Sequence, residues 1–158
     1  MTYIIDGHNL IPKIAGIDLS DPDDEIKLIK VLQDFCRLRR KKAVVYFDQA
    51  PPGMSGVKNY GSVRAYFVRK GRTADDAIME KLRKLGKRAR NVIVVSSDRQ
   101  VQQAARAAHA KVMSSNAFTK EWRSLISEEP SLDPRNRSLS EKELDEWEAI
   151  FKKGRDQK

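Results

Sequence analysis

Five short runs rich in apolar and β-branched residues alternate along the chain with longer segments whose apolar positions recur at helical spacing. Such runs predict β-strands, at residues 3–6, 43–48, 62–69, 91–98 and 111–115. Three of them are almost wholly apolar, as in strands buried on both faces of a sheet. The run at 62–69 alternates polar with apolar residues, so we expect it nearer a sheet edge. A Pro- and Gly-rich loop is expected between residues 49 and 61.

The segments between the strands predict helices. Ser20 or Asp21 is the expected N-cap of the first long helix, which carries apolar residues on one face. Later helices are predicted to begin near Ala74, to run from Arg99 to about His109, and to run from the N-cap Asn116 to about Glu128. Strands that alternate with helices through short connections predict a three-layer α/β fold around a largely parallel sheet of about five strands.

The chain divides into one main domain and a C-terminal appendage. Residues 1–129 form the predicted domain, residues 130–139 a polar, proline-containing linker, and residues 140–158 an amphipathic helix and tail. The apolar stripe of that helix comprises Leu144, Trp147, Ile150 and Phe151. We expect the stripe to pack on the main domain or on a partner subunit, which leaves both a monomer and a homodimer open.

Composition narrows the class of protein. A hydrophobic content of 40% and a charged content of 34% are typical of a soluble globular chain. No apolar run is long enough to span a membrane, and the start of the chain lacks the pattern of a signal peptide. The single cysteine, Cys36, fits a cytoplasmic protein and lies in a helical apolar pattern, which favours core packing over catalysis.

The net charge is +9, from 31 basic and 22 acidic residues. An excess of this size favours a polyanionic partner such as a nucleic acid, although a basic protein without such a partner is the open alternative.

Aspartates recur where the predicted strands end. Asp6, Asp48 and Asp98 each close a strand, and Asp75 and Asp76 open the helix after the third strand. The carboxyl ends of parallel strands meet at one edge of the sheet, so these side chains are expected to lie around one crevice. Carboxylates held close repel each other unless a cation neutralises them, and hard oxygen ligands suit Mg²⁺ or Mn²⁺. One cysteine and two histidines make a zinc site improbable.

Each aspartate also has a structural alternative. Asp98 can cap the helix that begins near Arg99, Asp76 can belong to a capping box with Thr73, and Asp48 can open a turn. No such role is obvious for Asp6.

Four motifs in this order resemble the NYN branch of the PIN-like ribonucleases, and more narrowly its YacP-type group. They are the opening Tyr-Ile-Ile-Asp-Gly-His-Asn-Leu-Ile from Tyr3, the strand Val-Val-Tyr-Phe-Asp ending at Asp48, Thr-Ala-Asp-Asp from Thr73, and Val-Val-Ser-Ser-Asp ending at Asp98. The resemblance runs from Tyr3 to about Glu128. It implies a PIN-like sandwich, a Mg²⁺ or Mn²⁺ site, endoribonuclease activity, and mRNA on the ribosome as a substrate.

On this basis the leading hypothesis is a metal-dependent nuclease for single-stranded RNA. Its metal ligands are Asp6, Asp76 and Asp98, supported by Asp75 and Asp48, while Asn9 and Ser97 orient ligands or phosphate. The expected grip on the RNA backbone comes from Arg64, Arg69, Lys70 and Arg72. The loop from Lys58 to Tyr60 is expected either to stack a base on Tyr60 or to leave that ring as an exposed turn residue.

Two other classes compete with this hypothesis. A non-catalytic RNA- or ribosome-binding module would keep the fold and the basic surface, but the complete acidic set favours an enzyme. A small-molecule phosphatase or nucleotide-binding protein is less favoured, because the chain has no phosphate-binding glycine loop and Asp6 is followed by Gly7 and His8 rather than by a second nearby aspartate.

Overall fold

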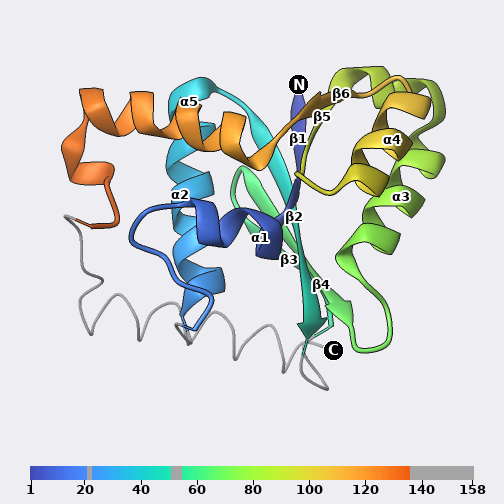
Figure 1. Cartoon of the computed structure of the whole chain (residues 1–158), viewed down its shortest axis with the longest axis horizontal. Coiled ribbons are helices and arrows are strands. Elements are labelled where there is room, and N and C mark those ends of the chain that lie inside the picture. Colours follow the sequence, from blue (N-terminus) through green and yellow to red (C-terminus); the bar gives the residue numbers. More distant parts are fainter. Residues whose placement is uncertain (21–22, 51–54, 136–158) are drawn as a thin grey trace.

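A six-stranded sheet lies between two layers of helices (Figure 1), in a computed structural model that describes residues 1–20, 23–50 and 55–135. The strand order is β3-β4-β2-β1-β5-β6, and every neighbouring pair is parallel except β3 with β4. The strands are β1 (Thr2–Asp6), β2 (Lys42–Ala50), β3 (Gly56–Tyr60), β4 (Val63–Arg69), β5 (Val92–Val95) and β6 (Lys111–Met113). The predicted α/β class with a largely parallel sheet is confirmed.

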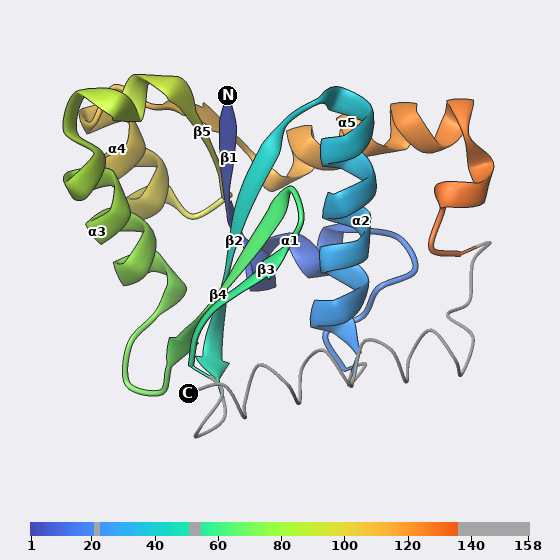
Figure 2. The ribbon, with the colours of Figure 1, turned by 180° about the vertical axis from the view of Figure 1, so that it is seen from behind.

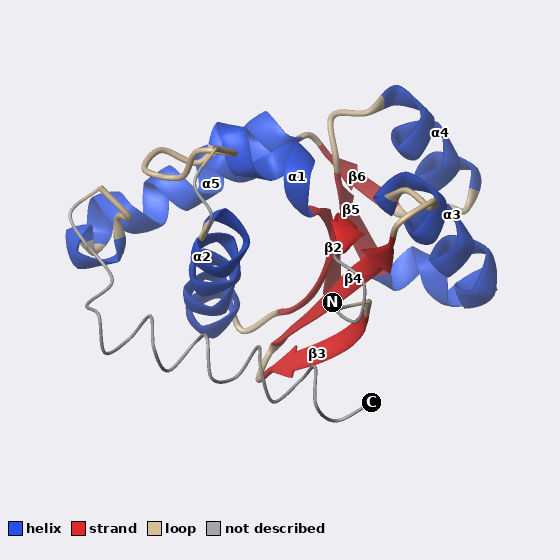
Figure 3. Ribbon diagram, turned by 90° about the horizontal axis from the view of Figure 1, so that it is seen from below, coloured by secondary structure: helices blue, strands red, loops and turns tan. Residues whose placement is uncertain are grey.

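Helices cover both faces of this sheet, as the view along the strands shows (Figure 3). One layer contains α3 (Ala74–Leu85) and α4 (Arg99–Ala107); the other contains α2 (Asp24–Arg39) and α5 (Ser115–Glu128). The short α1 (Gly7–Leu10) follows β1 directly, and three 3₁₀ turns, η1 (Ile11–Lys13), η2 (Gly86–Asn91) and η3 (Pro130–Leu132), connect other elements. The three-layer prediction is therefore also confirmed.

Alternation along β1 divides the core between the two faces. Tyr3 and Ile5 belong to the apolar cluster beneath α2 and α5, which also holds Cys36, whereas Ile4 belongs to the cluster beneath α3 and α4. Because successive side chains of a strand point to opposite faces, Asp6 falls on the α3 and α4 face. The packing of β1 thus decides which helices meet the first carboxylate.

The hairpin of β3 and β4 is the main departure from the predicted fold. Residues 56–60 were expected in a loop, yet they form an antiparallel edge strand. The strand β4 is consequently second from that edge, which agrees with the expectation that it lies nearer an edge of the sheet. Figure 2 shows this hairpin from behind. The strand has no apolar run, but the two-residue turn Gly61-Ser62, with Gly61 at φ +72°, is a hairpin signal in the sequence.

Two helix starts also differ from the predictions. The N-cap of α2 is Asp23, not Ser20 or Asp21. The N-cap of α5 is Ser114, whose hydroxyl accepts the Ala117 N–H at 3.0 Å, so Asn116 already lies inside the helix. A serine cap close to the predicted asparagine satisfies the same orphan N–H groups.

The start of the predicted linker packs against the domain. Leu132, in η3, is buried in the cluster beneath α2 and α5, and Asp133 is buried beside it in sequence. The predicted C-terminal amphipathic helix lies outside the described residues. Among the helices that the structure describes, none combines the length and the apolar character needed to cross a membrane.

Gly7 sits where β1 passes into α1, and any side chain there would collide with β2. A Cβ atom on Gly7 would lie 2.5 Å from the ring of Phe47 and 2.9 Å from the carbonyl oxygen of Tyr46. We expect Gly7→Ala to lower the free energy of unfolding by roughly 1–3 kcal/mol, because the core cannot yield without moving backbone. Urea denaturation measures this loss.

A double variant of Gly7→Ala with Phe47→Leu tests whether the clash with the Phe47 ring causes the loss of stability. If the clash with the Phe47 ring matters, Gly7→Ala costs less in the Phe47→Leu background than in the wild type. An equal cost in both backgrounds would contradict the steric explanation.

Candidate active site

Four aspartates, hereafter the acidic edge, come together where the parallel strands end: Asp6, Asp48, Asp75 and Asp98. Asp6 is the most buried of them. It ends β1 and is only 6% exposed. Burial raises the pKa of Asp6 to about 7, and the nearby Asp75 and Asp48 carboxylates add to the rise. A side-chain hydrogen bond joins Asp6 to Asp75, while the backbone N–H of Asn9 favours the ionised form of Asp6. Two carboxyl groups in this arrangement relieve their repulsion by sharing a proton.

Asp48 fixes the position of Asp75. It lies within β2, before the end of the strand at Ala50, so the prediction that it terminates the strand is wrong by a small margin. Its carboxylate accepts the backbone N–H of Ala74 at the first turn of α3. This bond pins the start of α3 to β2 and brings Asp75 beside Asp6.

Asp98 has the capping role that the sequence allowed as an alternative, whereas at Asp76 the cap is the Thr73 hydroxyl. Asp98 is the N-cap of α4, and its Oδ1 accepts the N–H groups of Gln100 at 2.8 Å and Val101 at 3.2 Å. Asp98 also raises the pKa of Asp75 by electrostatic repulsion, after the larger effect of burial. It therefore caps a helix and belongs to the acidic edge at the same time. Asp76 is exposed, and its N–H binds the Thr73 hydroxyl at 3.0 Å.

Asn9 ties three segments together behind the carboxylates. Its Oδ1 accepts the N–H of Ser97 at 3.0 Å and the hydroxyl of Ser115 at 2.6 Å. The Ser97 hydroxyl in turn accepts the N–H of Ser115 at 3.1 Å. Since the oxygen of Asn9 is occupied twice, its NH₂ group is the part left to donate to a ligand. Ser115, which is fully buried, is a site residue that the sequence did not reveal.

His8 is held in one tautomer. Its Nδ1 accepts the backbone N–H of Asp48 at 3.2 Å, and its ring packs against Phe47 with centroids 5.5 Å apart. A neutral imidazole that accepts through Nδ1 carries its proton on Nε2. His8 is therefore a hydrogen-bond donor close to Asp6 in sequence, and its Nδ1 is not available as a base in this state.

The donor chemistry of the edge fits a hard divalent cation. Its side chains offer carboxylate and amide oxygens. Burial raises the pKa values of Asp6 and Asp75, and repulsion from the neighbouring carboxylates adds to both shifts. As the side chains stand, no three His, Cys, Asp or Glu residues in the described part of the chain form a ready group of metal ligands. The carboxylates that a cation would neutralise instead bond to each other and to backbone N–H groups.

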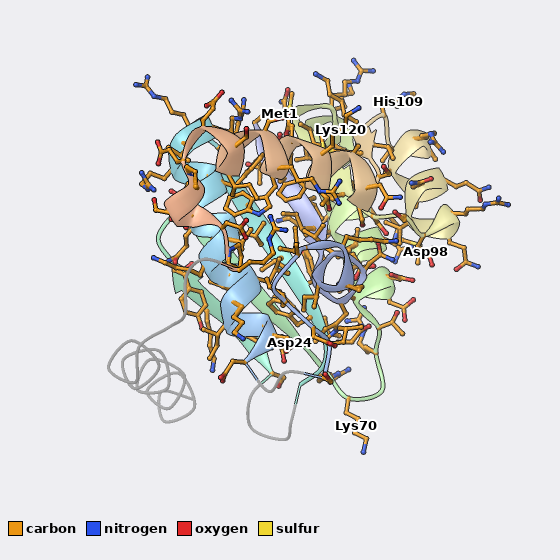
Figure 4. The ribbon with its side chains drawn as sticks, turned by 60° about the vertical axis from the view of Figure 1, so that its left-hand side comes forward. Met1, Asp24, Lys70, Asp98, His109 and Lys120 are labelled. Carbon is orange, nitrogen blue, oxygen red and sulfur yellow. The ribbon has the colours of Figure 1, made fainter. Side chains whose placement is uncertain are left out.

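The predicted RNA-binding residues are divided between two faces of the sheet. Arg69, Lys70 and Arg72 lie in and beside the connection from β4 to α3, at the same end as the acidic edge, where Lys70 projects from the molecule (Figure 4). Arg72 makes a 2.6 Å ion pair with Glu80. Arg64 is exposed on β4 and donates to Asn59 at 3.1 Å.

Two of the predicted RNA-binding residues, Tyr60 and Lys58, lie on the face of the sheet opposite Asp6. Tyr60 is 6% exposed and packs in the cluster beneath α2 and α5, so its ring offers no surface for stacking a base, and it is not an exposed turn residue either. The Lys58 ammonium lies 5.5 Å from the Phe67 ring, which belongs to the same cluster and hence to the face opposite Asp6. The alternation of β3 explains both placements, because Lys58 and Tyr60 are two residues apart.

Carboxylates at one edge of a mostly parallel sheet, with helices on both faces, are the arrangement expected of an NYN-type α/β domain. The YacP-like NYN domain family matches residues 3–152, and the chain belongs to this family, which is of the RNase type. The match continues well beyond Glu128, where the recognisable motifs end.

Solved structures agree on the fold. One crystal structure of Rae1 (YacP) from Bacillus subtilis is 22% identical, with a TM-score of 0.64 over 94% of this chain and 92% of that chain. Its W164L mutant is 21% identical, with a TM-score of 0.65 over 80% and 77%. A search among curated proteins found no match.

The burial of Asp6 and the repulsion from its neighbouring carboxylates predict a gain of stability when the charge of Asp6 is removed. The folded protein holds the Asp6 proton more tightly than the unfolded chain, so without metal its stability falls as the pH rises from 3.8 to about 7. We expect Asp6→Asn in EDTA to raise the free energy of unfolding by roughly 1–3 kcal/mol at pH 8, and by less toward pH 4. Urea unfolding followed by fluorescence of the buried Trp122 measures it.

Asp133→Asn is the matched control, with the opposite sign. The Arg135 guanidinium holds the pKa of Asp133 below its ordinary range, so this carboxylate stabilises the fold above its unfolded pKa and the variant loses stability at pH 8. Equal losses in both variants would contradict the electrostatic account of the acidic edge.

Proposed function

We propose that this protein is a divalent-metal-dependent endoribonuclease that cleaves single-stranded RNA. The observation that carries the proposal is the Asp6–Asp75 carboxyl pair, in which Asp6 is buried, at one edge of a chain whose net charge is +9. Asp48 and Asp98 act on this pair electrostatically. A basic protein that concentrates acids at one point has a use for a cation there and for a polyanion around it. Membership of an RNase-type family supports the same function.

In this proposal Asp6 and Asp98 hold Mg²⁺ or Mn²⁺ together with Asp75. The sequence favoured Asp76 as the third ligand, but Asp75 is the residue bonded to Asp6, whereas Asp76 is exposed at the rim and takes a supporting role. The chemistry that such an ion supplies is activation of a water molecule and stabilisation of the charge that builds on the phosphate. Asp48 supports the site by holding the start of α3.

The protein's own donors then orient the RNA. The NH₂ group of Asn9 and the Nε2–H of His8 are hydrogen-bond donors near Asp6 in sequence, and a phosphate oxygen accepts from both kinds of group. Arg69 and Lys70 hold the flanking backbone through charge. Resemblance to YacP-type proteins supports mRNA on the ribosome as the substrate.

Loss of the carboxylates is expected to abolish cleavage without unfolding the protein. Asp6→Asn and Asp98→Asn each remove a ligand, and asparagine caps a helix about as well as aspartate, so α4 keeps its cap. We expect each variant to lose at least about 100-fold in rate, a loss typical of a missing catalytic group. Cleavage of a labelled RNA, free and on translating ribosomes, is measured with Mg²⁺, with Mn²⁺ and with EDTA.

Thermal unfolding measures metal binding separately from RNA cleavage. Mg²⁺ or Mn²⁺ should raise the unfolding temperature of the wild type by more than that of Asp6→Asn, since the variant has lost one of the carboxylates that bind the ion. Full cleavage by both variants would overturn the catalytic assignment. RNA binding without cleavage by the wild type under every condition would instead identify a non-catalytic RNA- or ribosome-binding module.

The basic loop after β4 makes a separate prediction. Charge reversal at Arg69 and Arg72 should weaken RNA binding and flatten its dependence on salt. The slope should fall by roughly 0.7 for each phosphate of a single strand that the protein no longer neutralises. Arg123→Glu, at an exposed position on α5, is the control and should leave the slope unchanged. An unaltered slope in the loop variant would place the RNA-binding site on another surface.

A further inference from the structure

A row of side chains runs from the acidic edge to the outer strand of the sheet. Asp6 is paired with Tyr46 on β2, Tyr46 with Tyr66 on β4, and Tyr66 with Val57 on β3. Directly paired residues of neighbouring strands point to the same face. Tyr46, Tyr66 and Val57, hereafter the tyrosine row, therefore continue the face that carries Asp6.

The outer part of this row is open. Val57 is 49% exposed, which makes it one of three large apolar side chains among the described residues that are exposed, with Met1 and Leu19. Tyr66 is half-buried, whereas Tyr46 is 3% exposed. The two tyrosine rings stack, with centroids 5.3 Å apart and planes at 30°. The buried ring thus supports the partly exposed one from the side of the acidic edge.

A hollow of about 120 Å³ lies against the two rings. Its lining residues come from β2, β4 and α3 and the connection before α3: Tyr46, Tyr66, Arg72, Ala77, Glu80, Lys81 and Lys84. Three of these residues are cationic and one is anionic. The views from behind and along the strands show α3 near the end of β4, and β3 on the far side of β4 from β2 (Figures 2 and 3).

Glu80 organises the cations of the hollow. Its two carboxylate oxygens bind the Arg72 guanidinium at 2.6 Å and the Lys84 ammonium at 3.2 Å. The pair of bonds lowers the pKa of Glu80, so it stays ionised and keeps both cations at the mouth of the hollow. Arg64 is exposed and lies two residues before Tyr66 on the same face of β4, so it adds positive charge beside Tyr66 but outside the hollow.

Exposed aromatic and apolar side chains on a sheet, surrounded by cations, suit single-stranded nucleic acid. Bases stack on aromatic rings without regard to sequence, while arginines and lysines neutralise the phosphates. The bases of a duplex are already stacked and paired, so a duplex gains little from such a surface. The tyrosine row therefore selects for unpaired RNA by a means separate from the metal chemistry.

We propose that Tyr66 is the stacking platform for an unpaired base next to the cleavage point, with Val57 extending the platform and Arg72 and Lys84 holding the adjacent phosphates. Two strand spacings separate Asp6 from Tyr66, or about 10 Å, which is a reach suited to a neighbouring nucleotide. This inference rests on the proposed function and adds to it the surface that selects the substrate.

Affinity for RNA tests the platform independently of cleavage. The full-length protein is titrated, in EDTA, into a fluorescein-labelled single-stranded RNA oligonucleotide, and anisotropy gives Kd. Tyr66→Ala should weaken binding by roughly 5- to 100-fold, as expected when one base no longer stacks, and Tyr66→Phe should keep nearly wild-type affinity. Equal Kd values for Tyr66→Ala and the wild type would overturn the proposal.

Abasic RNA locates the stacked base. Oligonucleotides that lack one base at successive positions should bind the wild type more weakly at one position, and Tyr66→Ala should show no further loss at that position. The same loss in both proteins would show that the base stacks elsewhere and would overturn the assignment to Tyr66.

Val57→Glu gives a test that does not disturb the core, because Val57 is exposed. It places a negative charge on the platform and should weaken binding, whereas Leu19→Glu makes the same change at a residue that is 50% exposed and outside the row, and should not. Equal effects of the two variants would count against the platform. Binding that depends on Tyr66 without any cleavage by the wild type would retain the platform and reject the nuclease; cleavage without dependence on Tyr66 would do the reverse.

Discussion

Repulsion between carboxylates held close together is the constraint around which the rest of the structure is arranged. Asp6 and Asp75 share a hydrogen bond and Asp48 lies close enough to raise the pKa of Asp6. Such a group does not persist unless the backbone around it is fixed. The fixing comes from hydrogen bonds that use the same residues: Asp48 holds the start of α3, and Asp98 caps α4. The structural role of these aspartates is therefore compatible with the proposed one, because the hydrogen bond to the helix start is what positions the carboxylate.

The acidic edge and the tyrosine row share one face of the sheet, and positive charge surrounds them. Acids at the centre attract a cation, while Arg64, Lys70 and Lys84 around them attract a polyanion. A phosphate that approaches the central carboxylates meets less repulsion once a cation neutralises them, whereas the cations at the rim attract the RNA backbone with or without a metal. In the proposal, specificity for unpaired RNA comes from the half-buried ring of Tyr66, which a duplex cannot use.

Much of this arrangement could be predicted from the sequence, because it follows from local pattern. The apolar run before Asp6 and the cap at Asp98 are signals within a few residues, and the parallel topology then brings the two together. The strand β3 was missed because its residues show no apolar run, and Tyr60 was misplaced in consequence, since a residue expected in a loop turned out to face the core. Ser115 was missed for a different reason: its bond to Asn9 joins residues 106 positions apart, and no local pattern predicts such a contact.

That separation has a consequence for the protein during its own synthesis. Asn9 needs Ser97 and Ser115 to complete its hydrogen bonds, and these partners follow it by 88 and 106 residues. Closing loops of this length early is entropically unfavourable. The hydrogen bonds from Ser97 and Ser115 to Asn9 therefore form only after the central strands have assembled. A nascent chain that has not yet exposed Ser115 thus carries the carboxylates of Asp6, Asp48, Asp75 and Asp98 without the frame that aligns them. In the proposed function, the active site is therefore completed only after Ser115 has joined the fold.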